Sequence, residues 1–76
     1  MADVKYLRND PKFCAAHAVE EAGELAAALG KMLRWGPLSV NPELPPEQQE
    51  TNIDWVRREY ADLINAMDRL EASLLP

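Results

Sequence analysis

The sequence predicts an all-α protein in which two long antiparallel helices are joined by a proline-rich loop and completed into a four-helix bundle by homo-oligomerisation. Apolar residues recur every three or four positions in two segments, and a segment with four prolines separates them. No run of residues alternates as a strand would. The 76 residues form one small domain, 1–76, and a chain this short buries only about 60% of its unfolded surface.

The first helix is predicted over residues 11–35, after an N-terminal arm at 1–10. Asn9 or Asp10 can serve as its N-cap, and Pro11 suits the first helical position. The motif Gly36-Pro37 stops the periodic pattern. The apolar positions that define this helix are Phe13, Ala15, Val19, Ala22, Leu25, Ala26, Leu29 and Leu33.

A loop is predicted over residues 36–51, with a short helical turn at 46–49, and the second helix over residues 52–74. Thr51 or Asn52 can cap this helix, and Asp54 lies favourably near its N-terminal dipole. Its apolar stripe consists of Ile53, Val56, Tyr60, Leu63, Ile64, Met67, Leu70 and Leu74.

Association of identical chains follows from the small size of the core. Cys14 is the single cysteine, so no intrachain disulfide can stabilise the chain, and no Cys/His set indicates structural zinc. A lone hairpin leaves half of each apolar face in water, whereas two paired hairpins bury it. We therefore expect a dimer or a tetramer.

The charge and the hydropathy exclude several classes of partner. The net charge is −5, and the eight basic residues are spread along the chain, so duplex nucleic acid is not an expected partner. No segment approaches the roughly 20 apolar residues that cross a bilayer, and residues 1–10 lack the apolar run of a secretory signal. The expected location is the cytoplasm, without a membrane partner.

Two acidic pairs, one on each predicted helix, are the strongest functional signal. Glu21 and Glu24 lie roughly 60° apart on the first helix, and Glu59 and Asp62 have the same spacing on the second. Each pair flanks an apolar stripe, so four carboxylates are expected to converge at the border of the core. Such pairs are usually solvated, but converging carboxylates repel one another unless a hard cation such as Mg²⁺ or Mn²⁺ binds them.

The motifs "EEAGEL", "KMLRWG" and "REYADLINAMDRL" resemble the all-α nucleoside triphosphate pyrophosphohydrolases of the MazG-like superfamily, in particular the short proteins of phages and mobile gene cassettes. The hallmark of that superfamily is E-x-x-E on one helix and E-x-x-D on a later helix. The resemblance covers residues 17 to 75. It implies Mg²⁺-dependent hydrolysis of a nucleoside or deoxynucleoside triphosphate to the monophosphate and pyrophosphate, with Mn²⁺ as an alternative metal.

The resemblance assigns the metal to Glu21, Glu24, Glu59 and Asp62. Glu20 or Glu21 would position the attacking water, and the residues do not decide between them. Lys31 and Arg34 can contact the triphosphate, although ordinary compensation of the helix dipole explains them equally well. Asn65 can bind the sugar or the base, or be solvated, and Trp35 and Trp55 can stack on a base or pack near helix ends.

Two other functions fit parts of the sequence. A non-catalytic helical dimerisation or interaction module would use the acidic pairs as a surface for a basic partner, and it would not depend on metal. A di-iron carboxylate bundle usually needs a histidine three residues after a glutamate. Because His17 instead precedes Glu21 by four residues, the di-iron alternative is weak.

Overall fold

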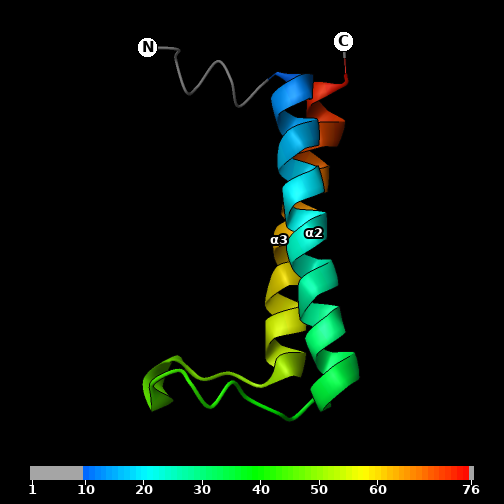
Figure 1. The fold of residues 1–76 in the computed structure, drawn as a ribbon. Helices are drawn as coiled ribbons and strands as arrows, with labels where there is room; N and C mark the ends of the chain where they lie inside the picture. The colour runs from blue at the N-terminus through cyan, green and yellow to red at the C-terminus, as the bar shows by residue number, and fades with distance from the viewer. Residues whose placement is uncertain (1–9, 76) are drawn as a thin grey trace.

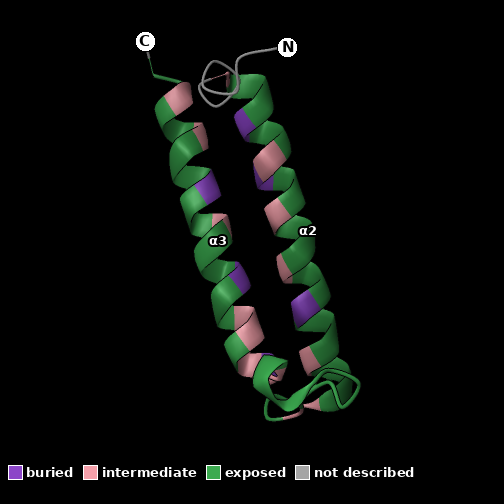
Figure 2. Ribbon diagram, turned by 90° about the vertical axis from the view of Figure 1, so that its left-hand side faces the viewer, coloured by how far each residue is buried: buried purple, intermediate pink, exposed green. Residues whose placement is uncertain are grey.

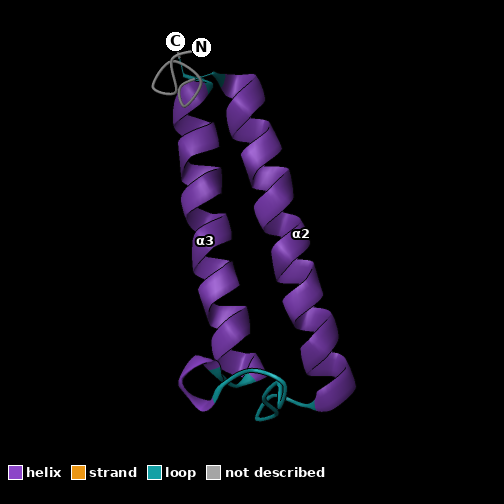
Figure 3. Ribbon diagram, turned by 60° about the vertical axis from the view of Figure 1, so that its left-hand side comes forward, coloured by secondary structure: helices purple, strands orange, loops and turns teal. Residues whose placement is uncertain are grey.

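A computed structural model describes residues 10–75 and shows two α-helices packed against each other (Figure 1). Helix α2 spans Pro11–Trp35, helix α3 spans Asn52–Ser73, and a single 3₁₀ turn, η1, spans Pro46–Gln48 in the loop between them. The start of α2 and the end of α3 lie side by side, so the helices are antiparallel (Figures 1 and 3). No strand occurs in residues 10–75, and the all-α prediction is confirmed for this part of the chain.

The bounds of the elements differ little from those expected. Helix α3 ends at Ser73, one residue before the expected end, and the turn η1 ends one residue before the expected 46–49. Residues 1–9 of the predicted N-terminal arm lie outside the described residues.

Polar side chains and one glycine set the ends of the helices. The N-cap of α2 is Asp10, which accepts a hydrogen bond of 3.1 Å from the backbone N–H of Lys12. The N-cap of α3 is Thr51, which accepts one of 3.2 Å from the backbone N–H of Asp54. Gly36 ends α2 with a φ of 93°, a conformation that favours glycine.

The hairpin is an elongated rod. It measures 45 × 25 × 14 Å, and its radius of gyration is 15.5 Å, whereas a compact chain of this length would have about 11 Å. Neither helix in residues 10–75 combines the length and the apolar character that crossing a bilayer requires. One chain therefore has no thick core, and its stability depends on the contact between α2 and α3.

The buried apolar residues in the contact between the helices, here called the seam, are all small. These residues are Cys14, Ala18, Ala28 and Ala66. Figure 2 shows that the buried stretches of α2 and α3 lie on the sides of the two helices that face each other. Intervals of three and four residues connect the residues of the seam on each helix, as in a coiled coil. The whole seam consists of Cys14, Ala18, Glu21, Leu25, Ala28 and Met32 on α2, and Asn52, Val56, Glu59, Leu63, Ala66 and Leu70 on α3.

Much of the expected apolar stripe is exposed in the single chain, contrary to its expected place in the core. Leu33 is 86% exposed and Val19 is 71% exposed. The exposed apolar residues follow seam residues by one position, a rotation of about 100°, and antiparallel packing places both sets on the same side of the hairpin. This surface, here called the leucine-rich face, consists of Val19, Leu29 and Leu33 on α2, and Tyr60, Ile64 and Met67 on α3.

The loop is pinned to the start of α3. The backbone N–H groups of Asn52 and Ile53 donate to the carbonyls of Ser39 and Pro37, each over 2.9 Å. The side-chain amide of Asn52 donates to the carbonyl of Gly36 over 2.9 Å and to that of Lys31 over 3.4 Å. Asn52 is buried, so these bonds fix the end of α2 against the start of α3.

Replacing Asn52 by alanine is expected to destabilise the fold by about 2 kcal/mol, because the carbonyls of Gly36 and Lys31 lose the donor that the buried side chain of Asn52 provides. Asn52→Asp is expected to cost at least as much, since a carboxylate would face two carbonyl oxygens. Denaturant unfolding followed by circular dichroism measures both changes, with Gln48→Ala in the exposed turn η1 as the control. Equal stability of Asn52→Ala and the wild type would contradict this role.

Candidate functional site

The two helices bring acidic side chains together near the middle of the hairpin. Carboxylate oxygens of Glu21, Glu59 and Asp62 all lie within 4.8 Å of one another. Oxygens of Glu20, Glu21 and Glu24 meet the same condition. Glu21 belongs to both groups and connects α2 to α3. We call these five residues the acidic cluster, which contains all the residues that the sequence assigns to metal binding or to positioning of the water.

The acidic cluster reaches deeper than the border of the core, where the sequence places it. Glu59 is only 5% exposed, and the side chain of Glu21 is 14% exposed. Both lie in the seam because the helices meet along the small residues rather than along the leucine-rich face. Glu20, Glu24 and Asp62 are exposed beside them, on the side of the hairpin away from that face. The cluster therefore has a buried floor and an open rim.

The two buried glutamates are held in matching ways. One oxygen of Glu21, Oε2, lies 3.2 Å from Nε2 of His17, whose ring stacks on Phe13. One oxygen of Glu59, also Oε2, accepts hydrogen bonds from the indole N–H of Trp55 over 3.1 Å and from Arg58 over 3.2 Å. Each carboxylate is thus anchored through one of its two oxygens.

The second oxygen of each buried glutamate has no hydrogen-bond partner. Oε1 of Glu21 and Oε1 of Glu59 are both buried, and no donor in the described part of the chain reaches them. Leaving a buried charged acceptor unsatisfied costs several kcal/mol in general. These two oxygens are the main indication that the cluster accommodates a cation.

Arg58 and Glu50 also belong to the site, although the sequence does not indicate them. Arg58 donates to Glu50 over 2.6 Å as well as to Glu59, so it connects the end of the loop to the acidic cluster. The hydrogen bond with Glu50 is the main reason why the pKa of Arg58 is raised above its ordinary value. Consecutive residues on a helix, such as Arg58 and Glu59, do not usually face each other. The position of Glu50 depends on the fold of the loop. Helical spacing therefore gives no signal for either contact.

Mutual repulsion within the cluster affects the titration of Glu24. The charge of Glu21 is the largest cause of a raised pKa at Glu24, followed by desolvation and by the charge of Glu59. The closeness of the Glu59 carboxylate and the charge of Glu20 add to the rise in the pKa of Glu24. Glu24 is therefore held in a site where a further negative charge is disfavoured.

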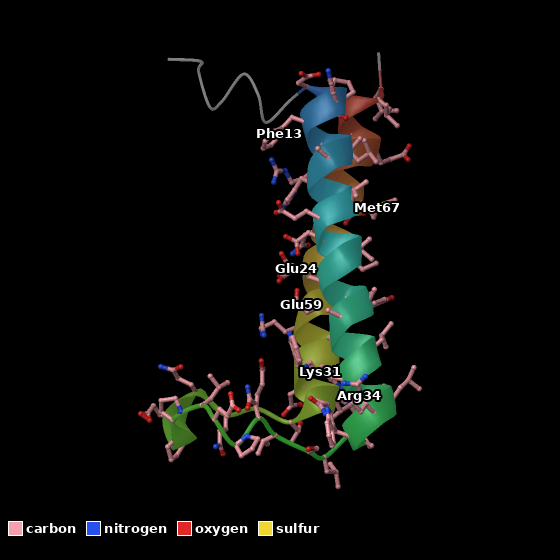
Figure 4. All side chains as sticks on the ribbon, in the orientation of Figure 1. Phe13, Glu24, Lys31, Arg34, Glu59 and Met67 are labelled. Carbon is pink, nitrogen blue, oxygen red and sulfur yellow. The ribbon has the colours of Figure 1, made fainter. Side chains whose placement is uncertain are left out.

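The three residues assigned to substrate are all exposed but differ in the surface that they adjoin. Lys31 is exposed two helical turns beyond Glu24 and lines a hollow beside the loop. Arg34 is exposed on the last turn of α2 and does not line that hollow (Figure 4). Asn65 is exposed one turn beyond Asp62 on α3. Lys31 is thus the basic residue of this set that adjoins a concave surface.

The arrangement is suited to binding a hard divalent cation. Carboxylates from two helices converge, two of their oxygens are buried without a donor, and such oxygens are the ligands that Mg²⁺ and Mn²⁺ prefer. The exposed rim leaves space for water or phosphate oxygens, which Mg²⁺ usually keeps in its coordination shell.

The repulsion at Glu24 predicts a pH dependence of stability without metal. A raised pKa means that the folded chain binds the proton of Glu24 more tightly than the unfolded chain does. Glutamates in an unfolded chain titrate at about 4.3. Stability from this group is present below that value and is lost as the pH rises through the raised pKa. Glu24→Gln is therefore expected to increase the unfolding temperature at pH 7 in chelator.

Thermal unfolding between pH 4 and 7 measures this effect. The difference in unfolding temperature between Glu24→Gln and the wild type should shrink as the pH falls, because protonation of Glu24 removes the repulsion that the substitution removes. Glu71→Gln, at an exposed position near the end of α3, is the control and should show little change across this range. A Glu24→Gln variant that is less stable than the wild type at pH 7 would contradict the expected repulsion.

Comparison with known protein families, with curated proteins and with solved structures gives no match to this chain. The resemblance to the MazG-like superfamily therefore stays a prediction.

Proposed function

We propose that the protein is an Mg²⁺-dependent nucleoside triphosphate pyrophosphohydrolase that converts a nucleoside or deoxynucleoside triphosphate to the monophosphate and pyrophosphate. The observation that carries the proposal is the pair of buried, unpartnered oxygens on Glu21 and Glu59 within one acidic cluster. The reaction itself comes from the resemblance of the two acidic motifs to the MazG-like superfamily.

Glu21, Glu24, Glu59 and Asp62 would hold the metal. His17 holds one oxygen of Glu21, and Trp55 with Arg58 holds one oxygen of Glu59, which restricts the rotation of both carboxylates and leaves the other oxygen of each for the metal. Bound Mg²⁺ would neutralise charge on the phosphate oxygens and lower the pKa of a coordinated water. The exposed acids allow a substrate to approach from the solvent.

The remaining residues have roles that follow from their positions. Glu20 is exposed at the rim, whereas Glu21 is committed to His17 and to the floor of the cluster, so Glu20 is better placed to accept the proton of the attacking water. Lys31, which lines the hollow, would bind the end of the triphosphate, and Arg34 would add positive charge nearby. Asn65 would contact the sugar or the base from α3.

The proposal includes association into a homodimer or a homotetramer. The leucine-rich face covers about 21 Å along α2 between Val19 and Leu33, and a second copy offers the same apolar surface. Since the acidic cluster lies on the other side of the hairpin, pairing through this face would leave the cluster open. Two hairpins would then complete a four-helix bundle.

Hydrolysis is expected to require both the metal and the buried acids. Purified protein with Mg²⁺ should release pyrophosphate from at least one member of a panel of ribonucleotides and deoxyribonucleotides, and chelator should abolish the release. Glu59→Gln should reduce the rate by at least about 100-fold, and so should Glu24→Gln combined with Asp62→Asn. Replacing residues that only orient metal ligands already lowers metal affinity or activity by about 10–100-fold, and these residues are expected to be ligands themselves.

The same assay tests the alternative function. Glu71→Gln should keep the wild-type rate and serves as the matched control for the glutamate changes. A helical interaction module would release no pyrophosphate from any nucleotide, with or without metal. Activity that survives Glu24→Gln with Asp62→Asn would contradict the assignment of the site.

Association is expected to depend on the leucine-rich face. Light scattering should give the mass of two or four copies of the 8.5 kDa chain. Ile64→Asp places a charge in the face and should dissociate the assembly, whereas Ala61→Asp, on the exposed outer side of α3, should not. A folded wild-type monomer at micromolar concentration would contradict this part of the proposal.

A further inference from the structure

A hollow of about 730 Å³ lies where the loop runs beside the ends of the two helices. Its volume is in the range of sites for small organic ligands. Two tryptophans contribute to its wall, Trp35 from the end of α2 and Trp55 from the start of α3, and Val40, Pro42 and Leu44 add apolar surface from the loop. The wall is therefore suited to a flat, apolar group.

The loop that forms this hollow is held in place before any ligand binds. Its start is fixed to α3 by the hydrogen bonds of Asn52 and Ile53 described above. Further along, Asn41 accepts from the backbone N–H of Glu43 over 3.0 Å, and Gln49 donates to the carbonyl of Leu44 over 2.9 Å. A preformed wall reduces the entropy that a ligand has to offset on binding.

Two residues that line the hollow are hydrogen-bonded to the acidic cluster. Trp55 and Arg58 line the hollow, and both donate to the same oxygen of Glu59. Trp55 is one turn from Glu59, about 6 Å along α3, and Lys31 is two turns from Glu24, about 10 Å along α2. A molecule that begins at the acidic cluster and extends past Lys31 therefore reaches the two indole rings.

We propose that the hollow holds the nucleobase of the substrate, with Trp35 and Trp55 stacking on the base and Lys31 contacting the phosphates between base and metal. This inference rests on the proposed function and names the part of the protein that distinguishes a nucleotide from bare polyphosphate. Indole rings stack on any base, because every base has a π face. Lys31 supplies positive charge on the wall of the hollow, and Arg58 supplies it where the hollow adjoins Glu59.

Calorimetric binding of nucleotides and of inorganic tripolyphosphate, each with Mg²⁺, tests the inference without relying on hydrolysis. Trp35→Ala should weaken binding of the nucleotides about tenfold, the loss expected for one stacking contact, and leave tripolyphosphate binding unchanged. Trp35→Phe should restore most of the affinity, since it keeps an aromatic ring. Leu38→Ala is the control, because Leu38 is exposed close to Trp35 but does not line the hollow.

The outcomes separate this inference from the proposed function. Base-dependent binding without pyrophosphate release would retain the hollow and reject the enzyme. Pyrophosphate release with unchanged nucleotide affinity in Trp35→Ala would retain the enzyme and reject the hollow. Equal weakening of nucleotide and tripolyphosphate, or no nucleotide binding by the wild type, would also overturn the inference. Trp35 is 61% exposed at the end of α2, so its replacement should leave the fold intact, which circular dichroism can verify.

Discussion

The contact of Glu21 with Glu59 across the seam is the constraint on which the rest of the structure depends. Both side chains occupy positions that a coiled coil would give to apolar residues, and the buried apolar residues of the seam are alanine and cysteine. The buried carboxylate of Glu59 and the half-buried one of Glu21 have oxygens within 4.8 Å and repel each other, so the hairpin carries an electrostatic cost at its centre. A bound cation would convert that repulsion into a crosslink between α2 and α3.

The hairpin has three sides, and each would serve a different part of the proposed function. The seam keeps the helices close and positions the buried glutamates, the leucine-rich face offers apolar area to another copy, and the acidic side with the hollow is open to solvent. A rotation of about 100° separates the seam from the leucine-rich face. Each function thus has its own stripe of residues on the same two helices.

Helical periodicity predicts the two helices and their caps, because apolar spacing, Asp10, Thr51 and Gly36 act locally. It also selects the acids that meet, since i, i+3 spacing fixes their direction on each helix. Helical periodicity places these acids too near the surface. Both the seam and the leucine-rich face carry apolar residues, and the larger apolar side chains of the leucine-rich face make that face the expected core. The contact of Arg58 with Glu50 and the hollow depend on the loop, whose path helical spacing does not determine.

Titration with Mn²⁺ followed by electron paramagnetic resonance tests the central claim most directly, because bound and free Mn²⁺ give distinct signals. The wild type is expected to bind Mn²⁺, and Mg²⁺ is expected to displace it. Glu21→Gln and Glu59→Gln should each abolish binding, whereas Glu71→Gln should not. Unchanged Mn²⁺ binding in both seam variants, or none in the wild type, would contradict a metal site between the two helices.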